Sequence, residues 1–172
     1  SFGDTHPVAW RVHPNGDVFG PIDLGGIEIE GLGIARDINN VAGGFADVVG
    51  ESEMVVGEGT VPRATRWTLS VPATGGLSVL AVEDLGALSG GLSSAAFGVT
   101  DSGDICGWSS KADAGNAAFS IRGGGPLQAL PKVRSEILSE AYDLSDTHVV
   151  GHSATSTAPY PKATRWDSRR AT

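Results

Sequence analysis

Short apolar segments alternate with turns rich in glycine, serine and asparagine along the whole chain. The first apolar segment, residues 8–12, is followed by His13-Pro14-Asn15-Gly16 and a second apolar segment at residues 17–24. This pattern predicts two strands joined by a tight turn, because Asn-Gly readily adopts positive φ. The second segment contains a proline, so we expect it at a sheet edge or a bulge. The best helix candidate, residues 135–142, is too short, and the pattern predicts an all-β protein.

One arrangement of residues recurs three times. In each copy an alanine begins a strand that runs into an Asn/Asp turn, and a second strand then ends in Gly-x-Ser. A leucine precedes that alanine by 11 residues in every copy: Leu24 and Ala35, Leu85 and Ala96, Leu130 and Ala141. A third strand has nearly the same sequence at residues 62–67 (PRATRW) and 161–166 (PKATRW). Four short strands in roughly 45 residues are typical of a β-propeller blade.

The phase of these repeats predicts the domain organisation. With the strands of a blade labelled a to d, the chain reads cd, abcd, abcd, abc. We therefore expect a single repeat domain of antiparallel four-stranded blades. Its predicted parts are a partial blade at 1–31, blades at 32–91 and 92–136, and a partial blade at 137–172. Closed rings usually need about four or more blades, so we expect an incomplete ring or a piece of a larger one.

This incompleteness also predicts partners. An open array leaves blade faces uncovered, and such faces pair or aggregate. We expect them to be covered by further blades of a parent chain or by a homo-oligomer. The chain begins at Ser1 without a visible signal peptide, so we expect a processed product or an excised fragment.

Composition and charge exclude several classes of protein. The 172 residues are 40% hydrophobic and 19% charged, which is a globular composition. The net charge is −8 and there is no basic stripe, so nucleic acid is not expected as a partner. No apolar run approaches the roughly 18 residues of a membrane span. The single cysteine, Cys106, excludes an intramolecular disulfide. It stands where other copies have Val49 and Val150, so we expect a core side chain rather than a nucleophile.

Two groups of residues could in principle hold a metal. His148 and His152 have the i, i+4 spacing of a helical zinc site, but this segment reads as a strand, where four residues span ~13 Å. One metal cannot bridge that gap, so we expect no shared site. Calcium could bind near the loop insertion at residues 41–46, and four acids lie there: Asp47, Glu51, Glu53 and Glu58. Alternate acids on one solvated strand face explain this group equally well.

Two segments resemble motifs of known hydrolases. Residues 91–95 (GLSSA) nearly match a nucleophile elbow, which requires a following helix, and here a strand follows. Residues 100–104 (TDSGD) resemble the Asp-box turn of sialidase propellers, but Val99 and Cys106 occupy the places of its serine and its aromatic residue. We expect Asp101 to bind the backbone of its own hairpin. Neither segment predicts a catalytic residue, and we assign no cofactor.

Two tryptophans occupy equivalent places in the repeated third strand. Trp67 and Trp166 share a strand face with Thr65 and Thr164, two residues earlier. Large rings packed between blades are one interpretation, and exposed platforms for sugars are the other. We expect burial.

Four motifs together resemble the HAF-repeat family of bacterial extracellular proteins. They are the Ala-x-x-Ile-Asn turn, the Val-Val-Gly-x-Ser strand, the Ala-Phe strand and the Leu-Gly-x-Leu-x-Gly connection, seen at residues 35–39, 48–52, 118–119 and 85–90. The resemblance implies a secreted or surface protein and brings no catalytic motif. It suggests a non-enzymatic binding or scaffolding module, with a glycan or a protein as the ligand. The alternative is a fragment of a propeller hydrolase or lyase that acts on polysaccharide, because such sites draw residues from several blades.

Overall fold

Strands are the only regular secondary structure in the described part of the protein. The computed structural model describes residues 5–28, 32–112, 115–132, 136–156 and 158–167, and none of these is in a helix. The all-β prediction is therefore confirmed. This described part also contains no helix with the length and apolar character needed to cross a membrane.

The described residues form thirteen strands. They are β1 (Val8–Val12), β2 (Val18–Asp23), β3 (Gly33–Ile38), β4 (Phe45–Val56), β5 (Gly59–Ser70), β6 (Ser78–Gly86), β7 (Ser94–Val99), β8 (Ile105–Ser110), β9 (Asn116–Ile121), β10 (Gln128–Ala129), β11 (Glu136–Leu144), β12 (His148–Thr155) and β13 (Ala158–Asp167).

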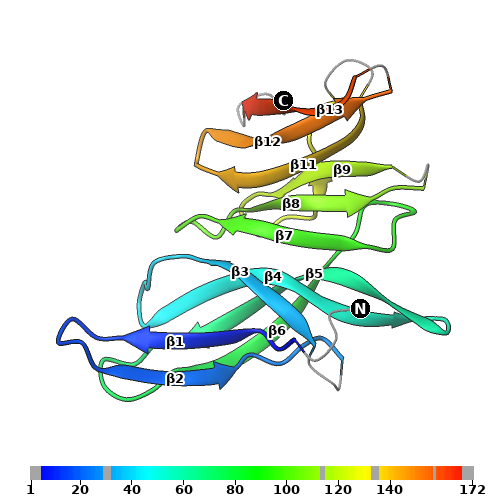
Figure 1. Ribbon diagram of the computed structural model, residues 1–172. Coiled ribbons are helices and arrows are strands. Elements are labelled where there is room, and N and C mark those ends of the chain that lie inside the picture. The colour runs from blue at the N-terminus through cyan, green and yellow to red at the C-terminus, as the bar shows by residue number, and fades with distance from the viewer. Residues whose placement is uncertain (1–4, 29–31, 113–114, 133–135, 157, 168–172) are drawn as a thin grey trace.

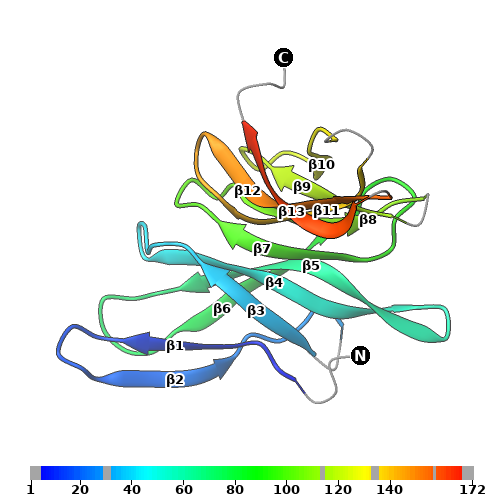
Figure 2. The same cartoon turned by 45° about the horizontal axis from the view of Figure 1, so that its top comes forward.

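The strands form four antiparallel sheets, each made from consecutive strands. The first sheet contains β1 and β2, the second β3 to β6, the third β7 to β10, and the fourth β11 to β13. The predicted segments 1–31, 32–91, 92–136 and 137–172 each hold the strands of one sheet, except that β11 begins at Glu136. Figure 1 shows the sheets arranged in chain order, from the first at the bottom to the fourth at the top, and in the turned view of Figure 2 the third and fourth sheets overlap.

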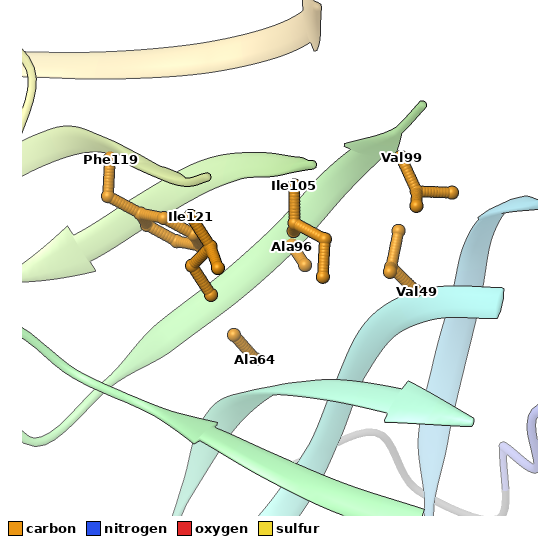
Figure 3. Close-up of a cluster of buried hydrophobic side chains, with 7 residues drawn as sticks. All are labelled: Val49, Ala64, Ala96, Val99, Ile105, Phe119 and Ile121. Carbon is orange, nitrogen blue, oxygen red and sulfur yellow. The ribbon is translucent and has the colours of Figure 1, made fainter. Parts of the chain in front are cut away.

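Apolar side chains fill the space between each pair of consecutive sheets. One cluster lies between the first and second sheets and includes Leu24, Val48 and Leu69. The next lies between the second and third sheets (Figure 3), with Val49 on one side and Phe119 on the other. The last lies between the third and fourth sheets. Burying both faces of the two middle sheets gives the core of the protein.

The 11-residue spacing from leucine to alanine has a packing explanation. The leucine lies at the end of one sheet and the alanine lies in the first strand of the next. In each copy the two side chains belong to the same intersheet cluster. The spacing therefore equals the length of the connection that joins the end of one sheet to the first strand of the next, where the alanine packs against the leucine's sheet.

The repeated glycine of Gly-x-Ser lies opposite a β-bulge in the first strand of its sheet. These bulges fall between Ala35 and Asp37, between Ala96 and Gly98, and between Ala141 and Asp143. The bulged strand brings a carbonyl oxygen so close that a Cβ atom on the glycine would lie 1.9–2.0 Å from it. The three glycines concerned are Gly50, Gly107 and Gly151. Only glycine allows this approach.

Buried serine hydroxyl groups join consecutive sheets at equivalent places. The Ser94 hydroxyl accepts a hydrogen bond from the backbone N–H of Ala64 at 2.9 Å and donates one to the carbonyl of Gly86 at 2.6 Å. The Ser139 hydroxyl accepts from the N–H of Ala118 at 3.0 Å. Each serine lies in the first strand of a sheet, and each N–H lies in the third strand of the preceding sheet. We call these contacts the serine ties.

Trp67 and Trp166 are buried, as predicted. Their exposed fractions are 0% and 6%. Each indole N–H donates to a carbonyl in the connection that follows the preceding sheet: Trp67 to Gly25 at 2.8 Å and Trp166 to Pro131 at 2.9 Å. The alternative of exposed sugar platforms is therefore wrong for both residues.

Candidate functional site

Planar side chains from the first strands of three consecutive sheets form one column. The guanidinium carbon of Arg36 on β3 lies 5.0 Å from the ring centroid of Phe97 on β7. The Phe97 ring stacks on Tyr142 of β11, with centroids 5.5 Å apart and planes inclined by 28°. The Tyr142 ring in turn lies against His152 of β12, with centroids 5.3 Å apart. We call these four residues the planar column.

The bulges described above explain why this column forms. Arg36, Phe97 and Tyr142 each follow the repeated alanine directly and lie within the bulge of their strand. The alanine packs against the preceding sheet, whereas the bulged residue after it contacts its counterpart in the neighbouring sheet: Arg36 contacts Phe97, and Phe97 contacts Tyr142. A guanidinium group over a ring and two stacked rings are both favourable arrangements.

Arg36 is held at its end of the column by a buried carboxylate. Its Nε donates to Oε2 of Glu51 at 2.8 Å, and a second nitrogen donates to Oε1. This bidentate pair raises the pKa of the Arg36 guanidinium, chiefly through the hydrogen bond. The side chain of Glu51 is 5% exposed and that of Arg36 is 38% exposed. The guanidinium is thus fixed in position while part of it remains open to solvent.

Tyr142 lies at the more open end of the column, next to two other polar groups. Its hydroxyl donates to Oε2 of Glu140 at 3.2 Å. Glu140 and His152 face each other directly across β11 and β12. Desolvation, followed by the charge of Glu140, raises the pKa of the Tyr142 phenol. The phenol therefore stays protonated at neutral pH, where it can donate a hydrogen bond or a proton.

These residues together offer aromatic edges flanked by polar groups. The ring faces contact one another within the column, so solvent meets mainly the ring edges, and the carboxylates, the phenol and the guanidinium provide hydrogen bonds at both ends. Binding sites for small ligands and sugars commonly combine apolar area with a few positioned polar groups. This column was not predicted from the sequence, although a large planar side chain directly follows the repeated alanine in every copy.

The hairpins between the first two strands of neighbouring sheets also contact one another. The backbone N–H and side-chain amide of Asn40 donate to the Asp101 carboxylate at 2.9–3.1 Å. These hydrogen bonds lower the pKa of Asp101. A hollow of about 360 Å³ lies beside them, with Asp47 and Arg66 in its lining. The prediction that Asp101 binds its own hairpin is wrong, because Thr100 fills that role by accepting from the N–H of Asp104 at 3.0 Å.

The acids proposed for calcium have separate partners. Asp47 accepts a hydrogen bond from Thr68 at 2.8 Å, and Glu51 pairs with Arg36. Glu51 is only 4% exposed, so the expectation of a fully solvated strand face is wrong at this position. Val49, a core residue, shares that face, because alternate residues of a strand point the same way. Glu53 lies on β4, and Glu58 lies in the turn between β4 and β5.

The two histidines also have different surroundings. His148 lies 3.2 Å from Asp167 through Nε2 and 2.8 Å from the Thr147 hydroxyl through Nδ1. His152 lies against the Tyr142 ring. Among the residues that the structure describes, no three His, Cys, Asp or Glu side chains converge as a metal site would require.

The segment that resembles a nucleophile elbow is a connection between sheets. β7 begins at Ser94, so a strand follows it, as the sequence indicated. The Ser94 hydroxyl is buried in a serine tie. The backbone N–H of Ser93 donates to the Ser110 hydroxyl at 2.9 Å. Both serines therefore hold the connection in place.

Cys106 is a fully buried core residue, as predicted. Burial raises the pKa of its thiol from 9.0 to about 12, with the nearby Asp143 carboxylate contributing. The thiolate is the reactive form. Cys106 therefore fits a packing role.

We expect Cys106 to react with thiol reagents about a thousandfold more slowly in the native protein than in the urea-unfolded protein at pH 8. The reason is that the pKa of its thiol is about 12 in the native state and 9.0 without burial, so the native protein holds far less thiolate. The measurement is the rate of labelling by an aromatic disulfide reagent, with glutathione as the control. A native rate within tenfold of the unfolded rate would contradict the assigned burial.

Comparison with models of protein families, with curated proteins and with solved structures finds no match for this chain.

Proposed function

We propose that this chain is a propeller-type repeat module that binds a neutral glycan through the planar column. The observation that carries the proposal is the continuous stack from Arg36 through Phe97 and Tyr142 to His152, which spans three sheets. The exposed ring edges of the column can contact the apolar face of a sugar ring, and flanking polar groups can then bind its hydroxyls. The resemblance to HAF repeats supports the propeller arrangement and an extracellular or surface location.

The charge of the protein favours a neutral ligand. The net charge is −8, and the one guanidinium of the column is already paired with Glu51. A polyanionic chain would be repelled over the whole surface and would find no free cation in the column. A protein ligand with an exposed ring or planar side chain is the competing partner.

Alanine at Tyr142 is expected to weaken glycan binding by tenfold or more, a loss of about 1.4 kcal/mol, because it removes a half-exposed aromatic ring and its hydroxyl group. Titration calorimetry with neutral glucan, xylan and galactan oligosaccharides provides the measurement. The matched control is Phe45→Ala, which removes a ring that is equally exposed but lies outside the column.

Equal losses in the two variants, or no binding of any neutral oligosaccharide at millimolar concentration, would refute the proposal. Binding of a protein ligand that depends on Tyr142 while every glycan fails would assign the column to the competing partner.

A second candidate function is elimination on a uronate polysaccharide. The negative net charge disfavours this polyanionic substrate, but one observation favours the reaction. Glu140, Tyr142 and His152 lie together on β11 and β12, and their chemistry fits proton transfer. His152 would take the proton from C5 of the uronate, the C4–O bond would break, and the leaving oxygen would take the phenolic proton of Tyr142. The raised pKa of Tyr142 keeps the phenol protonated at neutral pH but makes it a weaker acid, so the developing charge on the leaving oxygen must drive the transfer.

This candidate is tested by incubating the protein with polygalacturonate and alginate and following the ultraviolet absorbance of the unsaturated product. It requires turnover that His152→Ala abolishes, with His148→Ala as the matched control on the same strand. A flat absorbance trace would refute elimination and leave ligand binding, to a glycan or to the competing protein, as the function proposed for the column.

A further inference from the structure

The outer face of the fourth sheet carries side chains that are buried at equivalent places in the second and third sheets. Val49 and Cys106 are 0% exposed, whereas Val150, at the same repeat position, is 45% exposed. Ala64 and Ala118 are likewise 0% exposed, whereas Ala163 is exposed. In the second and third sheets the following sheet covers these residues. Figure 1 shows no sheet above the fourth.

A polar contact between sheets is half formed at the same face. Oδ1 of Asp37 accepts from the N–H of Ile38 in its own strand, and Oδ2 accepts from the N–H of Val99 in the next sheet at 2.8 Å. Asp143 holds the equivalent position in the fourth sheet, and its Oδ1 accepts from the N–H of Leu144 at 2.7 Å. No described residue donates to its second oxygen. The face thus repeats both the apolar and the polar features of a covered sheet.

From this equivalence we infer that the outer face of β11 to β13 binds one further repeat of the same kind. This inference rests on the propeller-type reading proposed above. The first strand of the added repeat supplies a backbone N–H to Asp143, at the place that Val99 occupies for Asp37. Its third strand places a large side chain over Ala163, as Trp166 does over Ala118 and Ile121 does over Ala64. The planar column then continues beyond Tyr142.

The test extends the chain with its own sequence. Trp67 and Trp166 are equivalent, so residues 1–167 followed by a copy of residues 69–130 keep the repeat in register. The copy supplies a last strand for the fourth sheet and then a complete further sheet. Cys106→Val within the copy ensures that the added repeat contributes no thiol to the labelling. The original Cys106 is buried, so the reporter is the only exposed thiol. A reporter thiol, Val150→Cys, is placed in both the original and the extended chains.

We expect the Val150→Cys thiol to be labelled rapidly in the 172-residue chain and at least tenfold more slowly in the extended chain. Val49→Cys, at the equivalent covered position, serves as the control and is expected to be slow in both. In the extended chain Asp143→Ala should restore part of the labelling rate, and Asp143→Asn, which keeps an acceptor oxygen, should restore less.

Equal labelling of Val150→Cys in the original and extended chains overturns the inference, whether the added repeat docks elsewhere or stays unfolded. Protection in the unextended chain that grows with concentration, together with a doubled mass by light scattering, also overturns it and assigns the face to a second copy. These measurements use no glycan, so the column proposal and this inference can fail independently.

Discussion

Alanine at Trp67 is expected to lower the free energy of unfolding by about 3–5 kcal/mol, the usual cost of removing a large buried ring. Trp67 is 0% exposed and packs in the cluster between the first and second sheets. Its loss leaves a cavity, and it also removes the donor that the carbonyl of Gly25 accepts from at 2.8 Å. Urea denaturation followed by far-ultraviolet circular dichroism measures the change.

The matched control for this variant is Trp10→Ala. Trp10 is 54% exposed, so its removal should change the unfolding free energy by no more than about 0.5 kcal/mol. If the two variants unfold at the same urea concentration, the intersheet packing of Trp67 is wrongly assigned.

Alanine at Gly107 is expected to cost about 3 kcal/mol, the upper end of the usual penalty for overpacking. Its Cβ would lie 1.9 Å from the carbonyl oxygen of Ala95 and 2.9 Å from the Cα of Ala96. Both obstacles are backbone atoms, so β7 must move, and β7 carries the Ser94 tie and the ring of Phe97. Equilibrium urea unfolding and the near-ultraviolet dichroism of the aromatic rings measure the effect.

Gly59→Ala is the control, because nothing lies within 4 Å of the added Cβ. It should be neutral or stabilise the protein by about 0.4–1 kcal/mol, through the restricted unfolded chain. A loss at Gly59 equal to that at Gly107 would show that the close approach to the bulge is not the cause.

Local repeats made much of this fold predictable. The 11-residue spacing from Leu24 to Ala35 and its two copies marks where one sheet ends and the next begins. The repeat position of Cys106 and the recurrence of Trp67 in the third strand also predicted core side chains, and both are buried. Such features depend on residues close together in the chain, which is why spacing alone reveals them.

Contacts between sheets were harder to predict. The partner of Asp101 is Asn40, 61 residues earlier, and no short-range pattern links them. The bulges also interrupt the two-residue alternation, so the direction of Phe97 does not follow from counting along β7. The ion pair between Arg36 and buried Glu51 could not be predicted either, because the sequence does not show which faces of the second sheet are covered.

The serine ties make this molecule a linear chain of units in thermodynamic terms. Each tie joins a sheet only to its immediate neighbour, as Ser94 does with Ala64 and Ser139 with Ala118. The free energy of such an array is a sum of sheet terms and nearest-neighbour terms. Substitutions in the first and fourth sheets should therefore be additive, whereas Ser94→Ala weakens only the coupling between the second and third sheets.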